Sequence, residues 1–385
     1  MPDAFITGFG EYLEKQSSLS FFELLSKAFI DAIKMANIES DEIDGLVFAT
    51  ATGTIEDPPL RNLLLDQVAN FLGLKNLRYM DIVDYGGASF NGMIYRAYRA
   101  IKDGYANAVL VLGGGKGTIR KKITTTNLFT RHHSNFLNVK EFVPTSDYAM
   151  VALRYSYEYN VSNESRALVA VRERSNASLN PNALFRSPIN VNDVIKSPIV
   201  SYPLRLLECV MPIDGFSAYI LTSEFKSKRS EITPIKIQGY GEAHDPRLIT
   251  EKENILDNPV PLSSKMALKR ANISLSDIDL FMLYDAYTIM ILLEIEGIGL
   301  AEKGKGWKFV EENDFSSSST YPINTNGGTL NVGQPGYMSG GVILTEALRE
   351  LSGLAEHRQI KGIKYALVNG LGGILNHSTT LILGV

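Results

Sequence analysis

The stretch DYGGASFNGMIYRAYRAI, residues 84–101, joins a glycine turn to the start of a helix. It follows the apolar-leaning LRYMDIV, residues 77–83, and precedes KDGYANAVLVLGGGK, residues 102–116. This order predicts a strand, a sharp turn, a helix and a second strand. Such a turn at a helix N-terminus typically presents a reactive side chain. We call residues 84–89 the elbow, and its turn offers only two glycines, an alanine and a serine.

A helix, a short acidic turn and an apolar strand occur twice in the same order. They span residues 20–50 and 261–287, and Ile43 of the first copy matches Ile278 of the second. A glycine turn, a helix and a buried strand ending in glycines also recur, at residues 86–116 and 333–373. The two matches predict an internal duplication of an αβ unit. The alternative is two unrelated αβ units, which share this pattern in general.

The composition excludes several classes of protein. The 385 residues are 45% apolar with a net charge of −4, which predicts a large core and no nucleic-acid partner. The single cysteine, Cys209, permits neither an internal disulfide nor a cysteine-based zinc site, so we expect no metal and a cytoplasmic location. Residues 1–16 lack the features of a signal peptide, and Asp285, Glu294 and Glu296 interrupt the most apolar window, so no membrane span is expected.

The duplication divides the chain into three parts. We expect an N-terminal half over residues 1–116 plus 201–230 and a C-terminal half over residues 231–385. Residues 117–200 match neither copy and are rich in Arg, Lys, Asn, Ser and Pro, so they are interpreted as an inserted loop region.

Five motifs resemble, in their order and spacing, those of the thiolase superfamily over essentially the whole chain. They are LLECVMPIDGFSAYILTSE (206–224), LYDAYTIMILLEIEGIGLAEKGKGWKFVEEN (283–313), PINTNGG (322–328), GQPGYMSGG (333–341) and NGLGG (369–373). The motif at residues 283–313 also resembles the sterol-carrier-protein-X branch. The resemblance implies a duplicated α/β thiolase fold with two mixed five-stranded sheets in five α-β-α-β-α layers. It also implies that the loop region cradles coenzyme A and that the protein is a homodimer.

The family's three catalytic groups are missing at the matching positions. Its cysteine nucleophile falls on Gly87, its activating histidine on Gln334 and its second cysteine on Asn369, and none of these residues can form a thioester or take up a proton near neutral pH. Cys209 is interpreted as a small buried hydrophobe. Ser89 is a weak substitute nucleophile, with a helix cap as the alternative. An elbow without a side chain is expected to leave room for a branched acyl chain and to offer backbone N–H groups to an oxyanion.

Two tyrosines in matched motifs point to a cysteine-free chemistry. Tyr284 opens YDAYT, and Tyr337 lies in GQPGYMSGG. These motifs resemble the retro-aldolases of steroid side-chain degradation, which act on β-hydroxyacyl-CoA thioesters with a tyrosine pair and a zinc-ribbon OB-fold partner protein. The resemblance implies Tyr284 and Tyr337 as the catalytic pair, and ordinary buried tyrosines are the alternative. Asp285 is expected to orient a neighbour or cap the helix that follows it, and Asn324 to bond a thioester oxygen or shape its turn.

Coenzyme A thioester is expected as substrate or ligand, with no tightly bound cofactor. The basic residues near the family's phosphate site either pair with phosphates or are merely solvated; they are Lys116, Arg120, Lys121, Lys122 and Arg131. Three functions follow. The first is retro-aldol cleavage or formation of a C–C bond, the second a non-catalytic acyl-CoA-binding or scaffold subunit for an OB-fold partner. The third is the acetyl-CoA acyltransferase or lipid-transfer role that a family-level name suggests.

Overall fold

The computed structural model describes residues 3–49, 63–118, 144–336 and 339–385. The strands of the N-terminal half follow the order β3-β2-β4-β7-β1. They are β1 (Ala4–Glu14), β2 (Gly45–Ala49), β3 (Tyr79–Ile82), β4 (Ala108–Lys116) and β7 (Pro212–Ser223). Those of the C-terminal half follow the order β8-β12-β11-β9. They are β8 (Ile235–His244), β9 (Leu280–Leu283), β11 (Tyr365–Gly372) and β12 (His377–Gly384).

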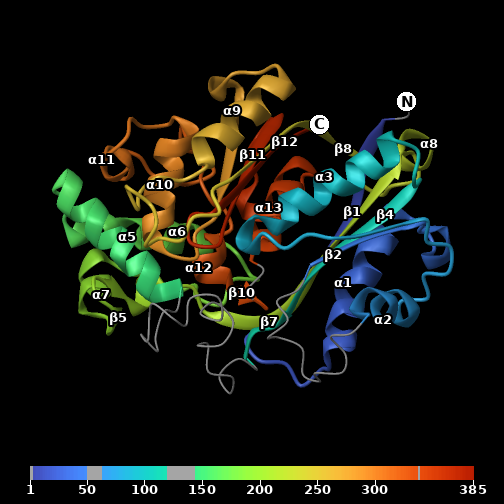
Figure 1. Cartoon of the computed structure of the whole chain (residues 1–385), viewed down its shortest axis with the longest axis horizontal. Helices are drawn as coiled ribbons and strands as arrows, with labels where there is room; N and C mark the ends of the chain where they lie inside the picture. The colour runs from blue at the N-terminus through green and yellow to red at the C-terminus, as the bar shows by residue number, and fades with distance from the viewer. Residues whose placement is uncertain (1–2, 50–62, 119–143, 337–338) are drawn as a thin grey trace.

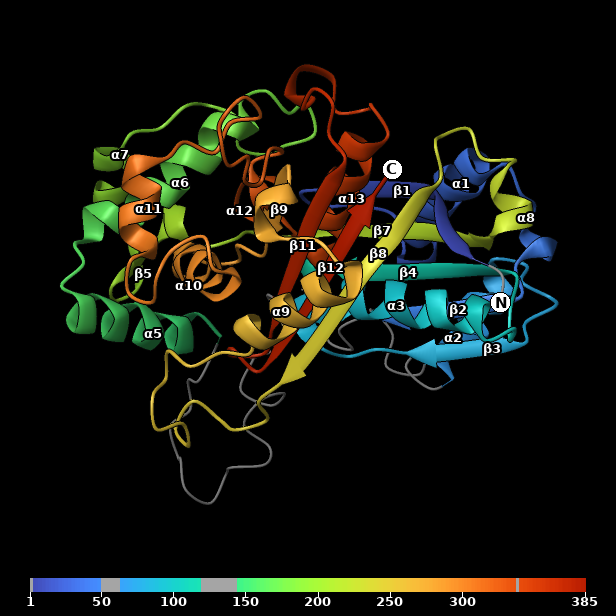
Figure 2. The same ribbon diagram turned by 90° about the horizontal axis from the view of Figure 1, so that it is seen from above.

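The two strand orders mirror each other, as the duplication predicts. Strands β2 and β4 pair in parallel, as do β9 and β11. Strand β7 runs antiparallel to β1 and β4, and β12 runs antiparallel to β8 and β11. Figure 2 shows β4 and β7 running across the view and β8, β11 and β12 running obliquely to them. The halves are joined where Phe5 and Ile6 of β1 pair with β8.

The strand count differs from the expected two sheets of five. The pairing of β1 with β8 makes one continuous ladder. The fifth strand of the second half shrinks to a single parallel bridge between Phe281 and Ile323. The reason is local, because Asn324 adopts a left-handed conformation (φ 46°) and turns the chain away from the sheet.

Helices cover and separate the strands (Figure 1). Helices α1 (Phe21–Ala36) and α2 (Leu64–Phe71) pack with one face of β2, β4 and β7 in a separate apolar cluster. Helices α3 (Ser89–Lys102) and α13 (Gly340–Leu351) contact each other and strands of both halves, so they form the middle layer. Helices α9 (Val260–Ala271) and α10 (Thr288–Ile298) lie on the far side, where α9 packs on β8 and β12.

A repeated glycine pair brings the outer helices close to the strands. A Cβ atom on Gly8 or Gly10 of β1 would lie 2.3 or 2.1 Å from a carbonyl oxygen of α1. On Gly239 or Gly241 of β8 it would lie 2.2 or 1.8 Å from a carbonyl oxygen of α9. Only glycine permits such an approach. The motifs GFG and GYG are thus a further trace of the duplication.

The described part of the inserted region lies beside the second half. Figure 1 shows its green helices next to the orange α10 and α11 (Gly306–Glu312). Its elements are α5 (Pro144–Tyr159), α6 (Asn163–Ala177), α7 (Val191–Lys196) and the start of β5 (Ile199–Ser201), which pairs with β6 (Leu204–Arg205) of the next segment. A buried ion pair between Arg166 and Glu208, with atoms 2.6 Å apart, ties α6 to the segment before β7. The domain boundaries themselves stay a prediction.

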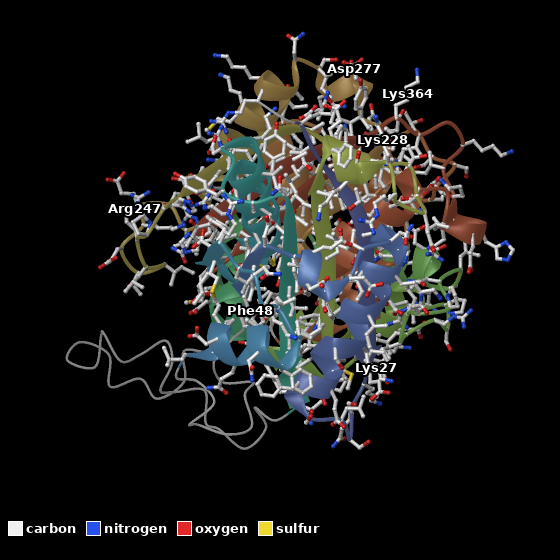
Figure 3. The ribbon with its side chains drawn as sticks, turned by 90° about the vertical axis from the view of Figure 1, so that its right-hand side faces the viewer. Lys27, Phe48, Lys228, Arg247, Asp277 and Lys364 are labelled. Carbon is white, nitrogen blue, oxygen red and sulfur yellow. The ribbon has the colours of Figure 1, made fainter. Side chains whose placement is uncertain are left out.

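The surface and the core are clearly separated. Figure 3 labels Lys27, Lys228 and Arg247, which are exposed, and Phe48, which is buried. Two further short elements are α8 (Glu224–Ser227), and β10 (Gln334–Pro335), which pairs with β7. Within the described residues, no helix is long and apolar enough to cross a membrane.

Candidate active site

The elbow is a 3₁₀ turn, Gly86–Ala88, that leads directly into α3. The buried Ser89 hydroxyl accepts the Tyr85 N–H over 2.8 Å. The N–H groups of Ala88 and Ser89 bond to the carbonyls of Tyr85 and Gly86. This geometry favours a structural role for Ser89. The role differs from the expected helix cap, because the accepted N–H belongs to Tyr85, which precedes the helix. The N–H groups of Ala88 and Ser89 are therefore not free for an oxyanion.

The space beside Gly87 is filled by Tyr284, which corrects the expectation of an open pocket. A Cβ atom on Gly87 would lie 2.3 Å from Tyr284 Cζ and 2.5 Å from the Leu371 carbonyl oxygen. Tyr284 follows β9 and is only 4% exposed. The aromatic ring therefore stands where a nucleophilic side chain would project, and the elbow leaves no extra room for a branched acyl chain.

The hydroxyl group of Tyr284 is held by two donors. Gln334 Nε2, at the position of the family's histidine, donates to it over 3.1 Å. Ser339 Oγ, at the start of α13, donates to it over 2.9 Å. Burial raises the pKa of Tyr284 to about 12, although both donors oppose the increase. The phenol is therefore neutral at physiological pH. Three of the predicted positions, Gly87, Tyr284 and Gln334, meet here, and Ser339 is an addition that sequence reasoning missed.

The raised pKa of Tyr284 predicts a loss of stability in alkali. A folded-state pKa above the ordinary value of 10 means that stability is complete below about pH 10 and falls as the pH rises towards 12. We expect the free energy of unfolding of the Tyr284→Phe variant to fall less steeply over this range. Chemical denaturation of both proteins at pH 9, 10 and 11 measures the difference, since the other buried tyrosines are common to both. An equal dependence of the free energy of unfolding on pH in the two proteins would contradict the raised pKa of Tyr284.

Asn369 does not reach the elbow. Its Nδ2 donates to Ser378 Oγ over 3.1 Å and to Thr380 Oγ1 over 2.8 Å, on the side of the strand that faces α9. The next residue, Gly370, faces the elbow, because its Cβ would lie 2.9 Å from Ala88 Cα and 3.0 Å from the Gly87 carbonyl oxygen. Successive strand residues point to opposite faces, so a one-residue shift of the motif explains the difference.

Asp285 anchors a helix beside the site. Its fully buried carboxylate accepts the N–H groups of Thr329 over 2.7 Å and Leu330 over 2.8 Å, at the start of α12 (Gly328–Val332). Burial raises the pKa of Asp285, although these donors oppose the increase. Of the two expected roles this geometry favours the cap, on α12 rather than on the helix that follows Asp285.

The Asp285→Asn variant is expected to be destabilised rather than catalytically altered. One Asn amide N–H would face a backbone donor, so we expect unfolding to need about 2 kcal/mol less. Denaturant titration measures this. Asp279→Asn is the matched control, because Asp279 also accepts two backbone N–H groups, from Lys364 and Tyr365, but is only half-buried. Unchanged stability with lost activity would instead indicate a role on the substrate.

The side chain of Asn324 makes its hydrogen bonds within the fold. Its Oδ1 accepts the Leu283 N–H over 2.8 Å, and its Nδ2 donates to the Leu283 carbonyl over 2.9 Å and to Glu173 over 2.8 Å. The residue is buried. This geometry favours the turn-forming alternative over contact with a thioester oxygen.

The remaining candidates divide between buried residues and residues outside the described part. Lys116 is buried, and its Nζ donates to the carbonyls of Ser17 over 3.4 Å and Leu19 over 2.7 Å, which favours an anchoring role. Burial raises the pKa of the Cys209 thiol to about 12, so it is no nucleophile at neutral pH. Tyr337, Arg120, Lys121, Lys122 and Arg131 lie outside the described residues.

A histidine pair packs behind the elbow. His244 ends β8 and His377 begins β12, and their Nδ1 atoms lie 2.9 Å apart. The Tyr85 ring lies 4.7 Å from the His244 ring and 5.5 Å from the His377 ring. The pairing joins two strands whose histidines are 133 positions apart in the sequence, so local sequence patterns do not reveal it.

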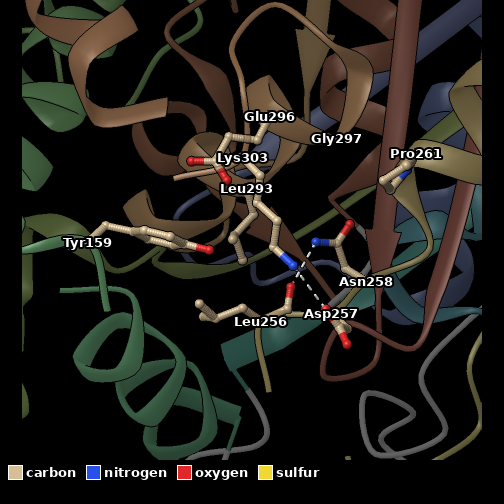
Figure 4. Close-up of a pocket in the computed structure, with 9 residues that line it drawn as sticks. All are labelled: Tyr159, Leu256, Asp257, Asn258, Pro261, Leu293, Glu296, Gly297 and Lys303. Atoms are coloured by element: carbon tan, nitrogen blue, oxygen red, sulfur yellow. Dashed lines mark hydrogen bonds and ion pairs between the residues drawn. The ribbon is translucent and has the colours of Figure 1, made fainter. Parts of the chain in front are cut away.

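A separate pocket opens between α5, α10 and the segment before α9 (Figure 4). Tyr159, Leu256 and Leu293 line it, and an ion pair of 3.3 Å joins Lys303 to Asp257 at its edge. None of the predicted site residues lines this pocket, so we place the candidate active site at the elbow.

The comparisons with known proteins agree with this geometry. The family model "Thiolase, N-terminal domain" matches residues 3–203, and "Thiolase C-terminal domain-like" matches residues 241–385. An acetyl-CoA acetyltransferase of Methanothermobacter thermautotrophicus is 28% identical over 375 residues, covering 95% of this chain and 94% of the relative.

Two further relatives are named as lyase and aldolase. A 17-hydroxy-3-oxo-4-pregnene-20-carboxyl-CoA lyase of Mycobacterium tuberculosis is 26% identical over 396 residues, covering 99% of both chains. The solved structure titled "Ltp2-ChsH2(DUF35) aldolase" superposes with a TM-score of 0.87 at 28% identity, covering 100% of this chain and 98% of the other. Both halves of the fold, the order of the motifs and the two family models therefore establish that this chain belongs to the thiolase superfamily.

Proposed function

We propose that this chain is a retro-aldolase that cleaves β-hydroxyacyl-CoA thioesters without a covalent intermediate. The observation that carries the proposal is the Tyr284 ring in the space beside Gly87, with its hydroxyl held by Gln334 and Ser339. A phenol in this place stands where the thioester would otherwise meet a nucleophile, so it can give a proton to the enolate that forms from the thioester. The names of the lyase and aldolase relatives support the same reaction class.

The reaction needs one proton acceptor and one proton donor. The acceptor removes the proton of the β-hydroxyl group, the Cα–Cβ bond breaks, and its electron pair passes to the thioester enolate while the β-carbon becomes a carbonyl. The enolate then takes a proton at Cα, which gives an aldehyde or ketone and a shortened acyl-CoA. Tyr284 is the proposed proton donor to the enolate. Tyr337 is the proposed acceptor of the β-hydroxyl proton, on the basis of its motif alone.

Recognition of the substrate and assembly follow from the same proposal. Coenzyme A phosphates are proposed to meet the basic residues after β4; these are Arg120, Lys121, Lys122 and Arg131. A DUF35-type OB-fold subunit is the proposed partner, because the related aldolase carries that component in its title. We also propose a homodimer and a cytoplasmic location, the latter consistent with a single cysteine.

The first alternative is a conventional acyltransferase, as the name of the archaeal relative suggests. Against it stands Gly87, which has no side chain to acylate, together with the raised thiol pKa of Cys209. The second alternative is a non-catalytic subunit that binds acyl-CoA. Against it stands the hydroxyl of Tyr284, which a mere scaffold would not need to orient with two donors.

One experiment separates these functions. The purified chain, alone and with a candidate DUF35-type subunit, is incubated with a β-hydroxyacyl-CoA and separately with a 3-ketoacyl-CoA plus free coenzyme A. Release of a carbonyl product and a shortened acyl-CoA from the first substrate is the expected result. Thiolysis of the second substrate would overturn the proposal, and coenzyme A binding without turnover in either mixture would favour the non-catalytic subunit.

A further inference from the structure

The oxygen atom of Tyr284 has both of its acceptor positions filled. Ser339 Oγ and Gln334 Nε2 both donate to it, and Ser339 is fully buried. A phenol oxygen offers two lone pairs besides its own proton. With both lone pairs engaged, the hydroxyl group can still donate its proton, but it has no free lone pair with which to accept one. Both hydrogen bonds found for this hydroxyl among the described residues are accepted by it.

The ring and backbone of Tyr284 are fixed as well. Gly87 packs against one edge of the ring, since a Cβ atom on it would lie 2.3 Å from Tyr284 Cζ and 2.6 Å from Cε2. The Tyr284 N–H donates to the fully buried Glu294 Oε2 over 3.1 Å. Since the ring, the backbone and the oxygen are all held, the direction of the hydroxyl proton is set by the protein rather than by solvent.

We propose that Ser339 and Gln334 are positioning residues that restrict Tyr284 to donating its proton, so that a different group must accept the β-hydroxyl proton. This inference rests on the proposed retro-aldol function and divides its two proton-transfer tasks. Position 334 matches the family's histidine, which activates a nucleophile. Glutamine in its place supplies an N–H donor, and its amide does not take up a proton.

The proton balance of the reaction follows. Tyr284 gives its proton to Cα of the enolate and becomes a phenolate. The two donors hold the phenolate charge, and hydrogen bonds to a charged oxygen are about twice as strong as those to a neutral one. The acceptor returns the β-hydroxyl proton through solvent, which restores the Tyr284 phenol after each cycle.

The test reads the phenol directly. Tyr284 is replaced by 3-fluorotyrosine, and the pKa of that phenol is measured by fluorine NMR with Ser339 intact and in the Ser339→Ala variant. Loss of one donor to the phenolate is expected to raise this pKa by about 1, and Ser339→Thr, which keeps the hydroxyl, is expected to restore it. Gln334→Met removes the other donor with little change of volume and is expected to act in the same direction.

Activity gives a second reading. With Tyr284 itself unmodified, Ser339→Ala is expected to lower kcat on a β-hydroxyacyl-CoA about tenfold with little change of KM. The matched control is Ser263→Ala, since Ser263 is buried and hydrogen-bonded but lies against Ser378 and Thr380 on the outer side of the sheet. In the Ser263→Ala variant, the pKa of the phenol at position 284 and the kcat should both match those of the parent protein.

The outcomes keep the two proposals apart. An unchanged phenol pKa in both Ser339→Ala and Gln334→Met would overturn the positioning role whatever the activity. A raised pKa without retro-aldol turnover in the parent protein would support the arrangement of donors and count against the proposed function instead.

Discussion

A Gly87→Ala variant should lose at least about 100-fold in retro-aldol activity, because it pushes the proposed donor out of position. The added Cβ would stand 2.3 Å from Tyr284 Cζ and 2.5 Å from the Leu371 carbonyl oxygen. A backbone carbonyl cannot rotate away, so the ring has to move, and the contacts of its hydroxyl move with it. We also expect unfolding to need about 3 kcal/mol less, the upper end for overpacking a core. Turnover and denaturant titration measure the two effects.

Two further variants locate the cause of that loss. Gly92→Ala is the matched control in α3, because its Cβ would first meet the Val83 side chain at 3.2 Å, which can shift. Gly87→Ala combined with Tyr284→Ala should regain part of the stability but none of the activity, since removing the ring relieves only one of the two contacts. A Gly87→Ala protein with normal turnover would show that the ring does not need its present place.

The duplication could be predicted because each copy has the same local sequence pattern. Helix, acidic turn and strand repeat within thirty-residue segments, and such periodicity survives in a single sequence. The glycine pairs Gly8/Gly10 and Gly239/Gly241 carried the same information and were open to discovery, since both have the form Gly-aromatic-Gly. The inserted region repeats nothing, so its packing beside α10 and α11 required the structure.

The site was predictable only in its parts. Gly87 and Tyr284 were both identified from motifs, but their contact was not, because 197 positions separate them. The motif alone therefore suggested an empty elbow where the fold places a ring. Asn369 illustrates a second limit, since a shift of one residue along a strand turns a side chain to the opposite face. Asp285 and Asn324 illustrate a third, because a motif looks the same whether its polar groups face a ligand or hold the backbone.

The Tyr284→Phe variant should lose about 10²- to 10⁴-fold in kcat, the usual contribution of a positioned proton donor. Phenylalanine keeps the ring against Gly87, so the binding of a β-hydroxyacyl-CoA, measured by calorimetry, should be nearly unchanged. Ser339 and Gln334 lose their shared acceptor, which should lower the free energy of unfolding by about 1–2 kcal/mol.

Tyr219→Phe is the matched control for Tyr284→Phe. Tyr219 is fully buried, and its hydroxyl bonds to the Gly341 carbonyl over 2.8 Å and to Thr345 over 2.9 Å. Both variants should therefore lose similar stability, while only Tyr284→Phe should lose turnover. If the two lost activity in equal measure, the effect of Tyr284 would be one of stability alone, and the proton would have to come from another group. A difference confined to kcat would instead assign the donor, because the ring, the fold and substrate binding are all retained and only the hydroxyl is gone.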